Sequence, residues 1–476
     1  MDILDYVMKV IIGVDHRYAK KIKKNGPAPE IPEVNPSVIK GDIYRMGFSR
    51  EEVMPDVDSG RDFWIAGHGS GHKMEGILSK VYVNALWVDC GNEEGILWLN
   101  GDFIGMTRIE INKIRSMIAQ SPVIKGCKLV NFSCTHSHSG IDTLGYWGKP
   151  FASIPSDGKD PEYMDALMKN SVKVAEQAFL NRKPGKLYNG RVEIKDGLFT
   201  KRGFIDKHEF LTRLRFAPDD GSNEIWVMNF GGHPNSLGGG NRMLSGEYPY
   251  FMRELISKEK GADVIFTIGA IGGMDVAEMD EDKVECVKKQ GEMIARAAFT
   301  IENETQLEPV IKFIQQPFYI PVDNYVLTLL AILHRMSFKA YPWDSLTGVA
   351  TESELTYMLI GSQKFLMLPG ENFVSTVYGS YMDADTSPTG EGGEINPTPL
   401  CEICGDSEMI AVGVTNDMTG YVVPPNDFIL NPTQPFLNTY KDKHGLNHYH
   451  ETNSMGINTQ KAIADTFAGM VERMNK

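Results

Sequence analysis

The sequence predicts an α/β protein in which helices alternate with buried strands. Short apolar runs rich in β-branched and aromatic residues recur between segments that show the 3.6-residue periodicity of helices. Hydrophobic residues make up 42% of the 476 residues and charged residues 23%, as in an ordinary globular protein. This interleaving favours layers of helices packed against a largely buried sheet.

An arm at residues 1–40 is expected to precede a single large domain at residues 41–476. Residues 1–24 place apolar side chains at helical spacing and end in lysines, and a proline-rich connector follows from Asn25 to Pro36. An amphipathic helix of this kind favours docking on the rest of the chain or a homo-oligomer interface over contact with a membrane.

Strands and helices are expected in turn along the large domain. Strands are predicted at Ala85–Val88, Ile96–Leu99, Lys128–Phe132, Ile225–Phe230, Phe365–Leu368 and Ile410–Val414. Helices are predicted near residues 107–120, 161–181, 246–259, 281–301 and 457–474. The segment Asp383–Leu400 is rich in Gly, Pro and Thr and is predicted to be a long loop, either a substrate lid or a surface insertion.

Charge and composition exclude several classes of protein. A net charge of −14 argues against nucleic acid and against a basic membrane-binding patch, so we expect a small-molecule substrate. No apolar stretch approaches the ~20 residues of a membrane span. The acidic start of the chain and the scattered cysteines lead us to expect a cytoplasmic protein. The pair Cys401 and Cys404 lacks the second pair of a zinc ribbon and is expected to lie outside any site.

Four of the predicted strands lead into residues that can bind a metal ion. The segments after them contain His136 and His138, then His233, Glu371 and Tyr421. Chemistry in open α/β sheets collects beyond the carboxyl ends of strands. Imidazole, carboxylate and phenol groups that converge there suit zinc, which binds N and O ligands and keeps one position open in catalytic sites.

Each of these residues also has a plain structural interpretation. An extended chain points His136 and His138 to opposite sides, so both can face one ion only where the chain bends. A division of labour, with one ligand and one proton carrier, is the simpler expectation. A lone histidine at a strand end, a carboxylate at a helix start and a half-buried tyrosine are all common without a metal.

Taken in order, the motifs resemble those of the neutral, non-lysosomal ceramidase family. Thr135–Gly140 is similar to the family's Thr-His-Thr-His-Ser-Gly segment. His233–Ser236 and Ser245–Glu247 are similar to its His-Pro-Thr-Ser and Ser-Gly-Asp segments. Pro369–Phe373 resembles its Pro-Gly-Glu-Pro-Phe segment, and Asn416–Tyr421 its Asn-x-x-x-x-Tyr segment. The likeness extends over nearly the whole chain after the arm.

This resemblance implies a layered α/β/β/α sandwich of mixed sheets that forms a single catalytic domain. It also implies one zinc ion, bound by His136, His233, Glu371 and Tyr421. His138 would line the site without being a primary ligand.

Further residues are expected to support the chemistry. The likeness implies that Asp102 orients a ligand and that Arg202, after Lys201, belongs to a basic pair of the pocket, a solvated turn being the alternative for that pair. His450 lies at the tyrosine of the family's Tyr-Glu pair, with Tyr449 beside it, and Tyr449 or His450 is expected to bind an oxyanion.

The chain also departs from the family. The family's catalytic serine is matched by Gly269, so a seryl nucleophile cannot come from this position. The C-terminal immunoglobulin-like domain and the secretion signal of the ceramidases are expected to be missing. A membrane sphingolipid is therefore not the substrate that we expect.

These observations predict a zinc-dependent hydrolase. It would cleave an amide or ester bond of a soluble small or amphiphilic substrate by attack of metal-bound water, and His138 would carry the proton to the leaving group. The alternatives are a lactone- or phosphoester-hydrolysing metalloenzyme that uses the same site, and a catalytically silent ligand-binding homologue.

Overall fold

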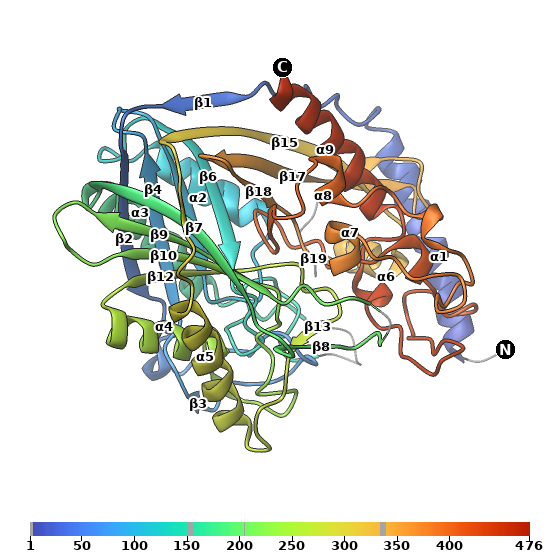
Figure 1. Cartoon of the computed structure of the whole chain (residues 1–476). Coiled ribbons are helices and arrows are strands. Elements are labelled where there is room, and N and C mark those ends of the chain that lie inside the picture. The colour runs from blue at the N-terminus through green and yellow to red at the C-terminus, as the bar shows by residue number, and fades with distance from the viewer. Residues whose placement is uncertain (1–2, 151–155, 204, 334–338) are drawn as a thin grey trace.

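The computed structural model describes residues 3–150, 156–203, 205–333 and 339–476 (Figure 1). Over these residues, two large β-sheets face each other and helices cover their outer sides. This arrangement confirms the predicted layered sandwich of mixed sheets in a single domain.

The larger sheet runs through the first two thirds of the chain. Its strands are β2 (Tyr44–Glu52), β4 (Tyr82–Asp89), β5 (Gly95–Gly101), β6 (Cys127–Cys134), β7 (Lys183–Glu193), β9 (Phe210–Pro218), β10 (Ile225–Phe230), β12 (Asp263–Ile268) and β14 (Thr305–Gln306). They follow the order β12-β10-β9-β7-β2-β4-β5-β6, with β14 beside β7. The pairs β5–β6 and β10–β12 are parallel and the other neighbouring pairs are antiparallel, so the sheet is mixed.

The second sheet comes mainly from the last third of the chain. Its strands are β1 (Ser37–Lys40), β15 (Val310–Val322), β16 (Ala340–Pro342), β17 (Val349–Ile360), β18 (Gln363–Met367) and β20 (Ile410–Val412). They follow the order β1-β15-β17-β18-β20, with β16 beside β17. The neighbours β18 and β20 are parallel.

Apolar side chains from both sheets fill the space between them. Trp98 of β5 and Phe365 of β18 meet there edge to face, with ring centroids 5.9 Å apart. Met46, Ile265 and Met358 belong to the same buried cluster. Burial of this apolar surface is the main force that holds the two sheets together.

Helices cover the outer faces of both sheets. The larger sheet carries α2 (Arg108–Ala119), α3 (Pro161–Leu180), α4 (Glu247–Lys260) and α5 (Lys283–Phe299), and the second sheet carries α9 (Thr459–Asn475). Side-chain caps fix two of the starts, because Asp160 accepts a hydrogen bond from the backbone N–H of Tyr163, and Asp282 accepts two at the start of α5.

Short elements join these layers near the ends of the strands. The short helices are α6 (Tyr325–Ile332), α7 (Val374–Tyr378) and α8 (Leu400–Ile403). The 3-10 turns are η1 (Val57–Ser59), η2 (Gly393–Ile395), η3 (Pro425–Asp427) and η4 (Glu451–Asn453). The short strands are β3 (Gly76–Ile77), β8 (Leu198–Thr200), β11 (Met243–Leu244), β13 (Met274–Val276), β19 (Glu371–Asn372) and β21 (Tyr421–Val422).

The N-terminal arm forms α1 (Ile3–Lys23), at the right-hand edge of Figure 1. This helix contacts α6 and β16 and buries Met8, Ile11 and Asp15. The arm therefore docks on its own chain, which is one of the two roles expected for it; a homo-oligomer interface stays a prediction. Within the described residues, no helix combines the length and the hydrophobicity needed to cross a bilayer.

Candidate active site

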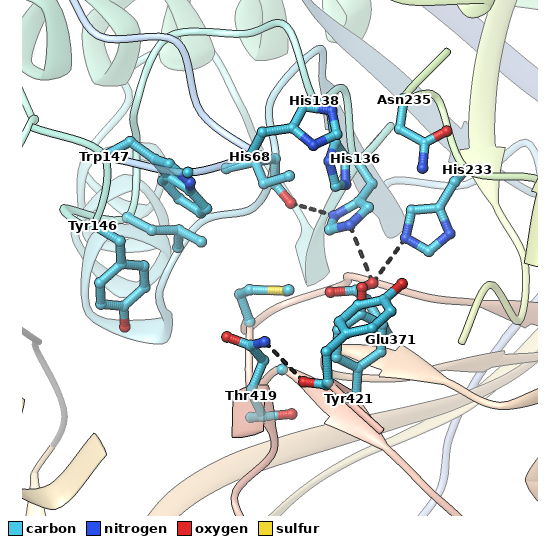
Figure 2. Close-up of a pocket in the computed structure, with 18 of the residues that line it drawn as sticks. His68, His136, His138, Tyr146, Trp147, His233, Asn235, Glu371, Thr419 and Tyr421 are labelled. Carbon is cyan, nitrogen blue, oxygen red and sulfur yellow. Dashed lines mark hydrogen bonds and ion pairs between the residues drawn. The ribbon is translucent and has the colours of Figure 1, made fainter. Parts of the chain in front are cut away.

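A cavity of about 670 Å³ contains all the residues that the sequence places in the metal centre. Its wall includes His136 and His138 after β6, His233 after β10, Glu371 after β18 and Tyr421 after β20. Figure 2 shows the rings of His136 and His233 directed towards the carboxylate of Glu371. The fold thus brings together five side chains that come from four separate segments.

A bend at His136 brings the first two histidines together. The residue has a positive φ of 62°, which is uncommon outside glycine, and it lies two residues after the buried end of β6. The rings of His136 and His138 consequently lie on the same side, with centroids 4.8 Å apart. The condition under which both histidines can face one ion is therefore met.

His233 is positioned by close contact between backbones. A Cβ atom at the preceding residue, Gly232, would lie 2.5 Å from the side chain of Val276, so only glycine fits there. The His233 ring centroid lies 5.0 Å from that of His136 and 5.4 Å from that of His138.

Backbone carbonyls fix the orientation of two imidazoles. His136 Nδ1 lies 2.6 Å from the carbonyl oxygen of Ile104, and His233 Nδ1 lies 2.8 Å from that of Met274. A nitrogen that faces a carbonyl has to carry a proton, so Nε2 is the nitrogen that both rings turn towards the site.

Glu371 lies between these two nitrogens. Its Oε2 atom is 2.8 Å from His233 Nε2 and 3.3 Å from His136 Nε2. The phenol of Tyr421 shares a hydrogen bond with the same carboxylate. Four donor groups thus meet at one point, which has the composition of a site for a divalent cation.

Burial and charge oppose each other at this point. Burial raises the pKa of Glu371, but the rings of His136 and His233 outweigh it and hold that pKa well below its usual value. Burial, reinforced by His136, lowers the pKa of His138. Burial, reinforced by Glu371, raises the pKa of Tyr421. The site therefore combines an ionised carboxylate, a neutral imidazole and a protonated phenol.

The residues present fit a metal ion. His136, His138 and His233 offer ligand atoms that all lie within 4.8 Å of one another. Both ring nitrogens of His138 are buried and have no hydrogen-bond partner among the described residues. Buried polar atoms are rarely left unpaired, so these nitrogens call for a partner from outside the protein. The cluster can therefore hold a metal ion.

Tyr449 and His450 lie beside the cluster. Tyr449 lines the cavity and accepts a hydrogen bond from Lys201, whose ammonium group is 2.8 Å from Asp275. The His450 ring stacks on Tyr449 at 3.9 Å and meets the Tyr421 ring edge-on at 4.6 Å, without lining the cavity itself. Of the two residues, Tyr449 is therefore the one whose side chain can reach a substrate.

Arg202 and Asp102 lie outside the cavity wall. Arg202 is buried and forms two hydrogen bonds of 2.9 and 3.0 Å with Glu451, the neighbour of His450. Asp102 is fully buried, pairs with Arg253 at 2.9 Å, and accepts a bond from Thr135, the neighbour of His136. Arg202 and Asp102 can therefore support neighbouring site residues, but they do not contact the cavity. The expectation that Arg202 belongs to the pocket is corrected.

Several expected features contribute nothing to the cavity wall. Gly269 lies at the end of β12, where a Cβ atom would be 3.2 Å from the Cα atom of Gly231. The loop Asp383–Leu400 contains η2 and does not line the cavity, which favours a surface insertion over a lid. Cys401 and Cys404 also lie outside it, as expected.

Sequence reasoning missed other parts of the wall. His68 belongs to a glycine-rich loop at residues 67–71, and its two flanking glycines were the available signal. An apolar wall comes from loops and from α6, which no motif marks; its members are Ile104, Leu144, Tyr146, Trp147, Leu327, Leu330, Met418 and Met455. Figure 2 shows Tyr146 and Trp147 across the cavity from His233.

Comparison with known proteins identifies the fold. No model of a protein family matches the chain. Among solved structures, the neutral ceramidase from Pseudomonas aeruginosa is similar, with a TM-score of 0.65 and 15% sequence identity over 92% of this chain and 75% of that one. A ceramidase complexed with C2 gives a TM-score of 0.66 and 14% identity over 91% of this chain and 75% of that one. The chain therefore has the fold of the neutral ceramidases, as the motifs predict.

Proposed function

We propose that this protein is a zinc-dependent hydrolase that cleaves an amide or ester bond of a small or amphiphilic substrate. One observation carries the proposal: Glu371 Oε2 lies within 3.3 Å of the Nε2 atoms of both His136 and His233, and Tyr421 shares its carboxylate. The similar structures are those of ceramidases, which are amide hydrolases, and they support this class of reaction.

The proposed ligands are His136, His233, Glu371 and Tyr421. Two imidazoles, a carboxylate and a phenol form the N and O donor set that zinc prefers, and the backbone carbonyls orient both rings so that Nε2 faces Glu371. When bound, zinc supplies a Lewis acid for the scissile carbonyl and lowers the pKa of water towards neutrality.

Neighbouring side chains would handle protons and developing charge. Lys201 donates a hydrogen bond to the Tyr449 oxygen, so the phenolic O–H is free to donate to the carbonyl oxygen of the substrate. His138 has two unpartnered ring nitrogens at the cavity wall and would accept a proton and return it to the leaving group. Gly269 offers no side-chain nucleophile, so the attacking group would not come from this position.

The wall of the cavity supports a substrate with an apolar part. Leu144, Trp147, Leu327 and Leu330 form one side, while Lys201 and the histidines form the polar side. A substrate that spans both would place its apolar group against the leucines and tryptophan and its scissile carbonyl at the metal.

The test is a hydrolysis assay on a panel of amides, esters and lactones, with and without a chelator. We expect turnover of an amide or ester that the chelator abolishes and added zinc restores. His233→Ala should lose this turnover, whereas His16→Ala, a change at an exposed histidine of α1, should keep it. A folded protein that binds the same compounds without turnover would favour the ligand-binding alternative.

A further inference from the structure

His68 is held against the candidate metal centre by the loop that carries it. Its ring meets the His138 ring edge-on at a centroid distance of 5.0 Å. Gly67 has a φ of 106°, and a Cβ atom there would lie 2.6 Å from His138, so the loop can approach this closely only because residue 67 is glycine. Gly239 also lies close to His68, since a Cβ atom at that position would be 3.8 Å from the His68 ring.

The hydrogen bonds of His68 leave one nitrogen unused. The ring donates to the backbone carbonyl of Asn235, whereas Nε2 is buried and has no partner among the described residues. The donating nitrogen is therefore Nδ1, and Nε2 of the neutral ring is an acceptor. A buried acceptor without a partner is unfavourable, so a group that enters the cavity should satisfy it.

We propose that His68 is a specificity-determining residue whose Nε2 accepts a hydrogen bond from an N–H or O–H group of the substrate next to the scissile carbonyl. This contact would lie beside the histidine cluster, because His68 is 5.0 Å from His138 and His138 is 4.8 Å from His136, ring centre to ring centre. The proposal rests on the proposed hydrolase function, and it separates substrates that carry a donor from those that lack one.

The hydrogen bond to Nε2 would favour substrates that carry a donor over substrates that lack one. A substrate without the donor would leave Nε2 buried and unpaired when it displaces water from the cavity, so it should be disfavoured by about 10-fold. A substrate with the donor pairs with Nε2 and avoids this loss. The apolar wall would contribute equally to the binding of both substrates, since their apolar groups are the same.

The experiment compares N-butyl decanamide with its isosteric ester, butyl decanoate. For each enzyme variant, kcat/KM is measured on both compounds, and the amide-to-ester ratio is compared with that of the wild type, which cancels the different reactivity of the two bonds. We expect His68→Phe to lower this ratio about 10-fold. His68→Gln, which restores an acceptor oxygen, should recover part of it, and metal content should not change.

His72→Phe is the matched control, because His72 directly follows this loop and does not line the cavity wall. Its amide-to-ester ratio should equal that of the wild type. An unchanged ratio in His68→Phe would overturn the assignment of His68.

A binding measurement keeps this test separate from that of the hydrolase function. The two compounds are titrated against His233→Ala, with tryptophan fluorescence as the readout, since Trp147 lines the cavity. The amide should bind about 10-fold more tightly than the ester, and the double variant His233→Ala/His68→Phe should bind them equally. If His233→Ala binds the amide and the ester with equal affinity, the role of His68 is refuted. If His233→Ala prefers the amide but the wild type hydrolyses neither compound, only the hydrolase function is refuted.

Discussion

Glu371 and Tyr421 are register partners in the short parallel pair of β19 and β21, and each follows a glycine with positive φ. The carboxylate and the phenol are thereby held side by side before any ligand arrives. His136 and His233 are held independently, by the carbonyls of Ile104 and Met274. The candidate centre is thus preorganised by backbone contacts, which is what precise ligand geometry requires.

Removal of the Tyr421 hydroxyl should weaken metal binding. Tyr421→Phe keeps the ring that packs against His450 but removes one proposed ligand, so the affinity for zinc should fall by roughly 10- to 100-fold. Competition with a chromophoric chelator measures this affinity. Tyr449→Phe, a change in the same cavity, should keep the affinity and lower kcat by about 100-fold. Equal zinc affinities in both variants would remove Tyr421 from the ligand set.

A side chain at Gly370 should disrupt the pairing of β19 with β21. Its φ is 69°, and a Cβ atom would lie 2.3 Å from the carbonyl oxygen of Gly420. Gly370→Ala should therefore lower the free energy of unfolding by about 3 kcal/mol, through backbone strain and a steric clash together. Gly390→Ala is the control for strain alone, since Gly390 has a φ of 79° and open space around it, and about 1 kcal/mol is expected. Urea denaturation measures both, and equal losses would show that the close approach at Gly370 is unimportant.

Loss of a side chain from the apolar wall should raise KM for substrates with a long apolar group more than for short-chain substrates. Leu330→Ala removes a buried apolar side chain from the wall, so KM for a substrate with a long apolar group should rise roughly 10-fold while kcat changes little. A short-chain substrate should show almost no effect. Leu333 lies just beyond the same helix and is 46% exposed, so Leu333→Ala should have the KM of the wild type. A KM that rises equally for both substrates would argue against an apolar subsite on α6.

Asp15 should make stability depend on pH. Burial raises the pKa of its carboxyl group from 3.8 to about 7, and neither oxygen has a partner among the described residues. Between about pH 4 and pH 7 the native state keeps a proton that the unfolded chain has lost, so this group destabilises the fold increasingly as pH rises. A shift of this size corresponds to at most about 4 kcal/mol above pH 7.

Asp15→Asn should therefore stabilise the protein, and more so at pH 8 than at pH 5. Thermal or urea unfolding at the two pH values measures the difference from the wild type. The control is Asp165→Asn, which makes the same change at an exposed aspartate. A stabilisation by Asp15→Asn that is the same at both pH values would contradict a buried, unpaired carboxyl group.

Strands that are buried on both faces were predictable from the sequence. The run Ile225–Phe230 is observed as β10 with the same bounds, and the expected strands into His136 and Glu371 are β6 and β18. Each has a parallel neighbour and is covered on both sides, so its apolar residues are continuous and its pattern is strong.

The long antiparallel strands were not predictable in the same way. β15 contains Pro317 and Pro321, which argue against a strand in sequence reasoning. The structure tolerates them because β1 pairs only with Val310–Phe313, so the rest of β15 is open on that side and needs no N–H donor there. This depends on where a distant strand ends, which no local pattern records.

The site was predictable only in part, for a similar reason. His136, His233, Glu371 and Tyr421 carry recognisable neighbours, and all four line one cavity. His68 sits in a loop that no strand precedes closely, and Leu327 and Leu330 belong to a helix that looks like ordinary core. Their place in the wall follows from tertiary packing alone.

We propose that one zinc ion is bound by His136, His233, Glu371 and Tyr421. The most direct test is elemental analysis of freshly purified protein, together with the folded His233→Ala variant. We expect about one zinc ion per chain in the wild type and a marked loss of zinc in His233→Ala. The proposed zinc site would be contradicted if folded wild-type protein takes up no zinc from zinc-containing buffer and binds zinc no better than His233→Ala.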